Sequence, residues 1–181
     1  FINIENFVSD EDCQEYIDHF DDMHGDGYRR TDDDAPWFND RVVCFTDTNP
    51  EIKKKLWQLS YSYSGVISNF YKEGPIYPET INICRWAEGD ELGLHGDAKY
   101  YPNGEDNYVY WRSHSVVTFL NSDFSGGEFY FHTGHIIEPK WGSIVGFDSS
   151  VDHAHGVKKV TEGFRYTVAM WFTMDEKYRL F

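Results

Sequence analysis

The 181-residue chain has few residues of the kinds that mark a membrane protein or a disulfide framework. No apolar run approaches the roughly 18 residues of a membrane-spanning helix, and no charged segment followed by an apolar one opens the chain. The three cysteines lie far apart without a Cys-x-x-Cys pair, which favours a reducing compartment. We therefore expect a soluble, intracellular protein without a membrane partner; one disulfide between two of the cysteines is the alternative.

Basic residues are also scarce, because 16 Lys and Arg stand against 31 Asp and Glu, giving a net charge of −15 at pH 7. An acidic protein repels phosphate groups, so we predict no nucleic-acid partner. Aromatic residues, in contrast, make up 18% of the chain and hydrophobic residues 40%, which is enough for a folded core. The length predicts a single domain over residues 1–181.

The first third of the chain has a helical pattern. Ser9 precedes three acidic residues, as an N-cap does, and apolar residues then recur at helical spacing as far as Gly25. A second helix is predicted over residues 50–71 and is ended by Gly74-Pro75. For the acidic loop at Asp32–Asp34 we expect a solvated turn, the alternative being a lid that favours basic substrates.

From Thr80 onward the hydrophobic period falls from about 3.6 residues to 2. Eight short strands separated by turn residues are predicted, over residues 81–86, 92–100, 115–120, 128–132, 136–138, 143–147, 153–157 and 164–173. Strands without intervening helices indicate a sandwich or jelly roll. We predict an α+β fold with a mainly β core over residues 80–181, and a helical support region over residues 1–79 packed on one sheet.

His95-Gly96-Asp97 is the first candidate for chemistry. At positions i and i+2 of a strand, an imidazole and a carboxylate point to the same side and can converge on one ion. His155 is the best third ligand, because two imidazoles and one carboxylate leave the open positions that suit non-haem Fe(II). His153 is its rival, on the same face of the predicted strand, and could instead orient a ligand.

Arg165 follows His155 by ten residues, on the next predicted strand. Its guanidinium offers a fixed fork for a carboxylate, with charge-assisted hydrogen bonds worth roughly 1.5–3 kcal/mol each. A dicarboxylic keto acid could chelate a metal at one end and reach Arg165 at the other. The alternative is a surface cation paired with one of the many acidic residues.

The order and spacing of these residues resemble those of the Fe(II)- and 2-oxoglutarate-dependent dioxygenases, and within them the prolyl 4-hydroxylase-like group. The resemblance covers nearly the whole chain, through residues 4–13, 85–97, 116–128 and 142–166. It implies a double-stranded β-helix, or cupin-like jelly roll. It also implies that the iron ligands are His95, Asp97 and His155, and that Arg165 binds the distal carboxylate of 2-oxoglutarate.

Three further positions take their roles from the same resemblance. Trp86 stands where the family commonly has a Tyr that bonds 2-oxoglutarate; since an indole donates but does not accept, this contact is altered or lost. Trp171, an even number of residues past Arg165, and Arg112 are implied to lie near the substrate. For His114, beside Arg112, we expect solvation on an edge strand.

The resemblance implies an enzyme that hydroxylates prolyl residues of a peptide or protein. Oxidative decarboxylation of 2-oxoglutarate to succinate and CO2 accompanies the reaction, O2 is the second co-substrate, and relatives often use ascorbate. Two alternatives are the same chemistry on a free amino acid or other small molecule, and a metal-binding jelly-roll module without turnover. Arg165 argues against the module, which has no need of a clamp for a keto acid.

Overall fold

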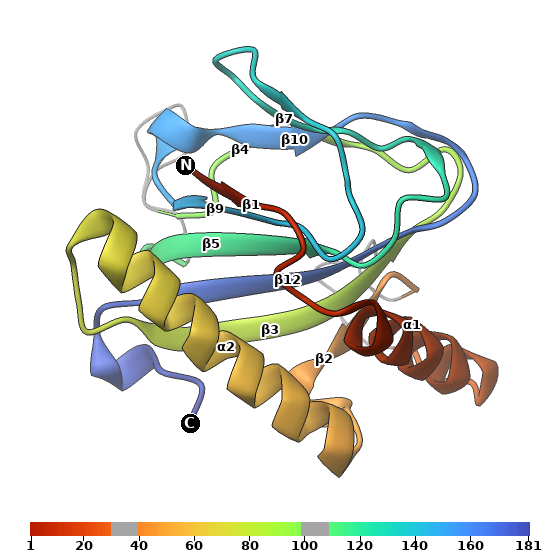
Figure 1. The fold of residues 1–181 in the computed structure, drawn as a ribbon, viewed down its shortest axis with the longest axis horizontal. Coiled ribbons are helices and arrows are strands. Elements are labelled where there is room, and N and C mark those ends of the chain that lie inside the picture. The colour runs from red at the N-terminus through yellow and green to blue at the C-terminus, as the bar shows by residue number, and fades with distance from the viewer. Residues whose placement is uncertain (30–39, 99–108) are drawn as a thin grey trace.

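The computed structural model describes residues 1–29, 40–98 and 109–181, and its strands form two facing antiparallel sheets (Figure 1). The larger sheet has the strand order β1 (Ile2–Ile4), β9 (Ile144–Asp148), β5 (Arg112–Phe119), β12 (Arg165–Thr173), β3 (Tyr77–Trp86) and β2 (Val42–Cys44). The smaller sheet has the order β4 (Leu92–His95), β10 (His155–Val157), β7 (Phe129–Phe131) and β8 (Ile136–Ile137). A third sheet consists of two strands only, β6 (Ser125–Gly126) and β11 (Val160–Glu162).

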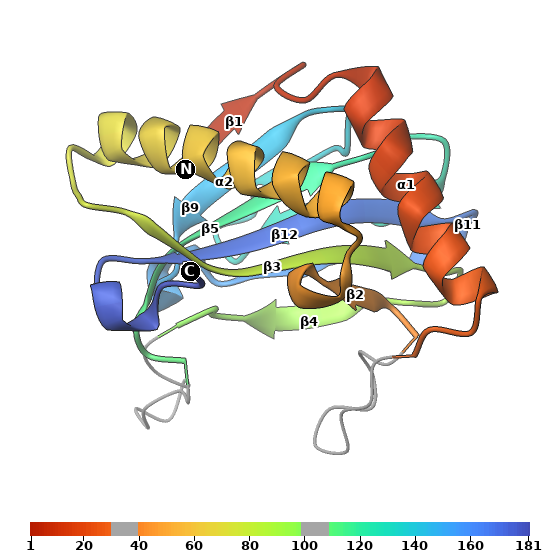
Figure 2. The ribbon, with the colours of Figure 1, turned by 90° about the horizontal axis from the view of Figure 1, so that it is seen from below.

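Two helices, α1 (Asp10–Gly25) and α2 (Pro50–Tyr71), lie across the outer face of the larger sheet, with β4 on the opposite side (Figure 2). Both predicted helices and their packing on one sheet are confirmed. Their first residues are fixed by side-chain caps: Ser9 accepts a hydrogen bond from the Asp12 amide, and Asn49 accepts from the amides of Glu51 and Ile52. No helix in the described part of the chain is long and apolar enough to cross a membrane.

Side chains alternate between two environments along β12, the strand that determines the layout of the interior. Its even-numbered residues from Tyr166 to Phe172 are buried in the core formed with α1 and α2. Its odd-numbered residues from Arg165 to Trp171 therefore face the smaller sheet. The space between the two sheets is where the candidate functional residues gather.

Helix α2 is tied to the larger sheet by a buried polar contact as well as by apolar packing. The Tyr63 hydroxyl, fully buried, hydrogen-bonds the Thr118 hydroxyl of β5. We expect Tyr63→Phe to lower the free energy of unfolding by about 1–3 kcal/mol, because it leaves the Thr118 hydroxyl buried without its partner. Urea denaturation measures this loss. The double variant with Thr118→Val should recover most of it, and a double variant as unstable as Tyr63→Phe alone would contradict this explanation.

The described residues hold twelve strands where the sequence predicts eight. The additional strands are β1, β2, β6 and β11, which span two or three residues each. Strand β4 ends at His95, so the predicted continuation through residues 96–98 is wrong; residues 99–100 and the Asp32–Asp34 loop lie outside the described residues. All three cysteines are free, so the alternative of a disulfide is wrong too.

Candidate metal centre

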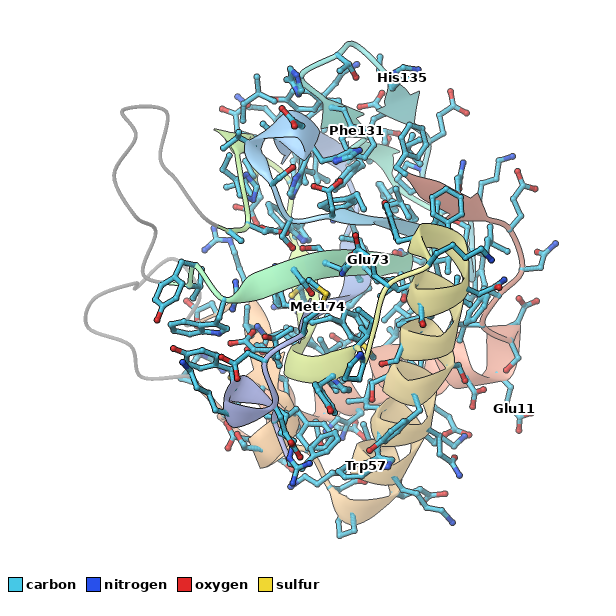
Figure 3. The ribbon with its side chains drawn as sticks, turned by 90° about the vertical axis from the view of Figure 1, so that its left-hand side faces the viewer. Glu11, Trp57, Glu73, Phe131, His135 and Met174 are labelled. Carbon is cyan, nitrogen blue, oxygen red and sulfur yellow. The ribbon has the colours of Figure 1, made fainter. Side chains whose placement is uncertain are left out.

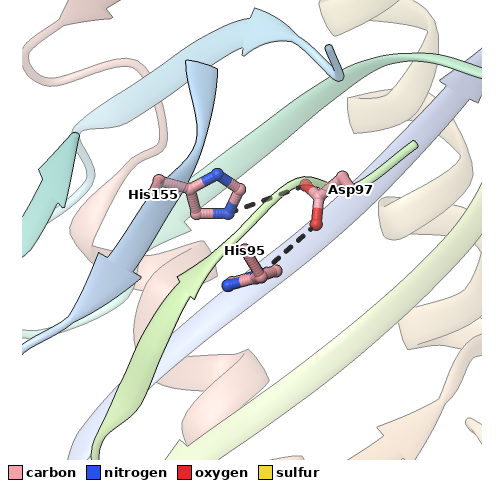
Figure 4. A group of neighbouring side chains, drawn as sticks. All are labelled: His95, Asp97 and His155. Atoms are coloured by element: carbon pink, nitrogen blue, oxygen red, sulfur yellow. Dashed lines mark ion pairs between the residues drawn. The ribbon is translucent and has the colours of Figure 1, made fainter. Parts of the chain in front are cut away.

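Three side chains converge at one end of the smaller sheet: His95, Asp97 and His155 (Figure 4). His95 is the last residue of β4 and His155 the first of β10, and the two are directly paired across these antiparallel strands. Asp97 Oδ1 lies 3.5 Å from His95 Nε2, and Asp97 Oδ2 lies 3.7 Å from His155 Nε2. One donor atom of each residue lies within 4.8 Å of the others, close enough for one metal ion to bind all three.

Backbone carbonyls orient both imidazole rings. His95 Nδ1 lies 3.0 Å from the Gly93 carbonyl oxygen, and His155 Nδ1 lies 3.0 Å from that of His153. Because a carbonyl only accepts, each Nδ1 carries the hydrogen and donates, and each Nε2 keeps its lone pair toward Asp97. The rings are thus held in the tautomer that a metal ligand requires.

The charge state of the cluster also suits a metal. Burial alone would raise the pKa of the Asp97 carboxyl, but the imidazoles of His155 and His95 and a hydrogen bond from Ser115 hold it well below its ordinary value. Burial lowers the pKa of His155, so this imidazole is neutral at pH 7. Burial would lower the pKa of His95, but the hydrogen bond and charge of Asp97 raise it, so a bound cation displaces the proton from this ring wherever the ring is charged.

His153, the rival third ligand, does not join the cluster. It lies in the short helix η3 (Val151–His153) and not on the strand with His155, so the prediction that both share a strand face is wrong. Its Nδ1 is 2.7 Å from Asp148 Oδ2. His153 acts on the candidate centre through its backbone carbonyl, which orients His155.

Arg165 is 1% exposed and lies between two aromatic rings, so the alternative of a surface cation is wrong. Its guanidinium carbon is 5.4 Å from the centroid of the Trp86 ring and 5.3 Å from that of Phe119. Among the described residues, Nε and Nη2 of Arg165 have no hydrogen-bond partner. Burial lowers the pKa of Arg165 to about 10, which corresponds to a cost of about 3 kcal/mol for holding the charge there. A bound anion would offset the cost of holding this charge in the interior.

The candidate metal centre and Arg165 border the same interior. Phe119, which flanks Arg165, belongs to one buried cluster with Phe129 and Phe147. The centroids of these last two rings lie 4.9 and 4.6 Å from that of His155. The candidate metal ligands and the Arg165 guanidinium are thus neighbours of the same cluster of buried aromatic rings.

Comparison with known proteins identifies this arrangement. The profile of the 2OG-Fe(II) oxygenase superfamily matches residues 81–173, about half of the chain, including all three residues of the cluster and Arg165. The chain belongs to the 2OG-Fe(II) oxygenase superfamily. Members of this superfamily use Fe(II), 2-oxoglutarate and O2, and the family recognised from the sequence is confirmed.

Relatives within the superfamily are prolyl hydroxylases. Prolyl 3-hydroxylase 1 of Rattus norvegicus is 28% identical over 211 residues, covering 97% of this chain and 29% of the relative. Prolyl 3-hydroxylase 2 of Homo sapiens is 43% identical over 150 residues, covering 71% of this chain and 20% of the relative. The chain therefore spans less than a third of the length of these relatives.

Solved structures confirm the jelly-roll fold of this oxygenase. A viral collagen prolyl hydroxylase from Paramecium Bursaria Chlorella virus-1, in complex with 2OG, has a TM-score of 0.72 at 17% identity, covering 97% of this chain and 96% of that one. A Pseudomonas putida prolyl-4-hydroxylase has a TM-score of 0.71 at 16% identity, covering 96% and 92%.

Arg112 and Trp171 of the oxygenase lie together. The Arg112 guanidinium is 4.4 Å from the Trp171 ring, and its Nε donates to Glu79 Oε2 at 2.9 Å. Trp171 is paired across the sheet with Ser115, which hydrogen-bonds Asp97. This pairing places Trp171 next to the candidate metal centre, whereas Arg112 lies one step farther out at the end of β5.

Arg112 also lines a hollow of about 650 Å³. Glu73 and Met174, which face the viewer in Figure 3, lie on its wall. His114 lines it as well, but is 2% exposed and sits on β5, an inner strand of the larger sheet. The expected solvation of His114 on an edge strand is therefore wrong.

Gly127 leaves room for the side chain of Arg165. Its φ is +68°, and a Cβ there would lie 2.9 Å from Arg165 Cδ. We expect Gly127→Ala to cost about 1–3 kcal/mol of unfolding free energy, because the backbone is strained and the new methyl group displaces Arg165. Chemical denaturation measures the loss. Gly65→Ala is the matched control: it faces open space in α2 and should leave stability unchanged or higher.

Several contributing residues are not evident from the sequence. Ser115 donates to Asp97, and Glu79 accepts hydrogen bonds from both Arg112 and the Trp111 indole. Ser115, Val117 and Phe119 occupy alternate positions along β5, and this spacing alone suggests that the Ser115 side chain points to the same face of the sheet as theirs. Glu79 carries no local signal, because its partners are more than 30 residues away.

Proposed function

We propose that this oxygenase domain hydroxylates prolyl residues of a peptide or protein, with decarboxylation of 2-oxoglutarate to succinate and CO2. The observation that carries the proposal is the buried Arg165, whose Nε and Nη2 have no partner among the described residues and which shares one interior with a carboxylate–imidazole cluster. The prolyl hydroxylases among the relatives support the substrate class.

In this proposal His95, Asp97 and His155 hold the iron. Two imidazole nitrogens and one carboxylate oxygen are the donor set that non-haem Fe(II) takes, and they leave coordination positions open. The bound Fe(II), together with 2-oxoglutarate and O2, supplies the oxidising chemistry. The protein contributes orientation: the carbonyls of Gly93 and His153 fix the rings, and Ser115 holds the Asp97 carboxylate.

Arg165 would bind the distal carboxylate of 2-oxoglutarate. Its Nε and Nη2 are buried donors, and a carboxylate placed there would form charge-assisted hydrogen bonds where water does not compete. Trp86, whose ring lies beside the guanidinium, would line the same pocket and restrict its shape. A keto diacid would thus be held at both ends.

Trp171 and Arg112 are the candidates for contact with the substrate. Trp171 lies beside Ser115, and Arg112, stacked on Trp171, lines the hollow next to it. Three aromatic side chains also line the hollow: Tyr71, Tyr110 and Trp111. Aromatic side chains around a hollow suit an extended peptide. The rival substrate, a free amino acid or other small molecule, would occupy the interior without needing this hollow.

Mass spectrometry of proline-rich peptides after turnover tests the proposal. With Fe(II), 2-oxoglutarate, O2 and ascorbate as the proposed reductant, we expect a gain of one oxygen on prolyl residues, matched by release of succinate. Omission of 2-oxoglutarate should abolish both products, and omission of ascorbate should shorten the period of activity. Succinate release without any oxygen gain on peptides would favour the small-molecule substrate, and absence of both products would leave only the module without turnover.

A further inference from the structure

The backbone around Arg165 is held by a side chain that sequence reasoning does not single out. Strand β5 ends at Phe119, which pairs with Thr167, so β12 extends beyond its neighbour on that side. On its other side, Arg165 pairs with Trp86 of β3. The Leu120 amide, just past β5, still donates to the Tyr166 carbonyl at 3.0 Å, but the Tyr166 amide and the Phe164 carbonyl bond a side chain on the side of β5 instead of a strand.

Asn121 provides that side chain. Its Oδ1 accepts a hydrogen bond from the Tyr166 amide at 2.8 Å, and its Nδ2 donates to the Phe164 carbonyl at 2.8 Å. The side-chain amide therefore bonds the residues directly before and after Arg165, as a neighbouring strand would. Asn121 is 5% exposed, so water does not replace these bonds easily.

The orientation of this amide is set by its partners. Nδ2 also donates to Asp123 Oδ1 at 2.7 Å, and both the carboxylate and the Phe164 carbonyl only accept. The Tyr166 amide only donates. A rotated amide would lose all three bonds, so Asn121 has one stable arrangement.

The Arg165 side chain depends on this backbone, because in the described part of the chain no hydrogen bond to its Nε or Nη2 fixes its direction. Two rings flank the guanidinium, and a Cβ added to Gly127 would lie 2.9 Å from Arg165 Cδ. These neighbours limit the space around the side chain without a hydrogen bond to it. A displacement of about 1 Å can cost roughly 100-fold at a site that requires alignment. Small shifts of β12 would therefore weaken the binding of a carboxylate to Arg165.

We infer that Asn121 is a positioning residue, which aligns Arg165 and so sets the affinity of the domain for 2-oxoglutarate. The inference rests on the proposed role of Arg165. It predicts that Asn121→Ala changes only the affinity for the co-substrate: the Kd and KM for 2-oxoglutarate should rise about tenfold. The metal affinity, and kcat at saturating 2-oxoglutarate, should change less than about threefold.

The test is a calorimetric titration of Mn(II)-loaded protein with 2-oxoglutarate, beside steady-state kinetics of the Fe(II) enzyme. The matched control is Asn49→Ala, which removes an amide that caps α2 and bonds neither Phe164 nor Tyr166; it should lower the melting temperature but leave the Kd for 2-oxoglutarate unchanged. If Asn121→Ala does not fold, Asn121→Ser replaces it, since serine is too short to reach both backbone groups.

A double variant separates this inference from the proposed function. If Asn121 acts through Arg165, adding Asn121→Ala to Arg165→Met should weaken 2-oxoglutarate binding no further. A full additional tenfold loss would overturn the inference, and so would an unchanged Kd in Asn121→Ala while Arg165→Met weakens binding. An unchanged Kd in Arg165→Met would overturn the role of Arg165 itself, and the inference with it.

Discussion

Replacing Asp97 with Asn should abolish turnover, with a fall of at least about a thousandfold in succinate release. Asp97 is the single anionic donor of the cluster, and its two carboxylate oxygens each face one imidazole. An amide cannot supply the charge, and its NH2 group would point hydrogens at one ring nitrogen. Mutation of a residue that only hydrogen-bonds a metal ligand lowers metal affinity about 10–100-fold. Because Asp97 is itself a proposed ligand, we expect Asp97→Asn to weaken Fe(II) binding by more than about 100-fold.

Metal titration under anaerobic conditions measures this directly. Asp12→Asn is the matched control, because it removes the same charge from the first turn of α1, where Asp12 pairs with Lys55 at the surface. It should change neither metal affinity nor turnover. An Asp97→Asn protein that binds Fe(II) as tightly as the parent would show that the ion sits elsewhere.

Replacing Arg165 with Met should weaken 2-oxoglutarate binding by about 100-fold or more, because two charge-assisted hydrogen bonds of roughly 1.5–3 kcal/mol each are lost. The ligand-free protein should at the same time become more stable, by about 1–3 kcal/mol, because an apolar side chain replaces a buried charge whose Nε and Nη2 find no partner in the described ranges. Titration with 2-oxoglutarate and thermal unfolding without ligands measure the two effects.

Opposite signs for binding and stability distinguish a functional charge from a structural one. Arg165→Lys, which keeps the charge but not the fork, should retain part of the affinity and gain little stability. An Arg165→Met protein that is less stable than the parent would mean that Arg165 supports the fold. That result would remove the reason for assigning a carboxylate to it.

Local signals explain why the helical third of the fold is predictable. Caps such as Ser9 and Asn49 satisfy backbone amides within three residues, so the first residue of each helix is visible in the sequence. The strands of five or more residues are predictable for a similar reason, since each repeats its pattern often enough. Strands β7, β8 and β10 span only two or three residues each but are marked by the turn residues around them, whereas β6 falls on Ser125-Gly126, whose sequence indicates a turn.

The residues of the candidate site were predictable from the sequence, but the strand pairing and positions that bring them together were not. The order of His95, Asp97, His155 and Arg165 points to the chemistry, whereas the pairing of His95 with His155 depends on a register across 60 residues. Asp97 reaches the cluster from beyond the end of β4, not from a strand as predicted. Asn121 lies in a segment that resembles the family, but its role could not be predicted, because it exists only where β5 stops short of β12.

An anaerobic crystal structure with Fe(II) and 2-oxoglutarate tests the central claim most directly. The account predicts one ion bound by Nε2 of His95, Nε2 of His155 and the Asp97 carboxylate, with the distal carboxylate of 2-oxoglutarate hydrogen-bonded to Arg165. An ion on other residues, or a keto acid whose distal carboxylate lies away from Arg165, would contradict it.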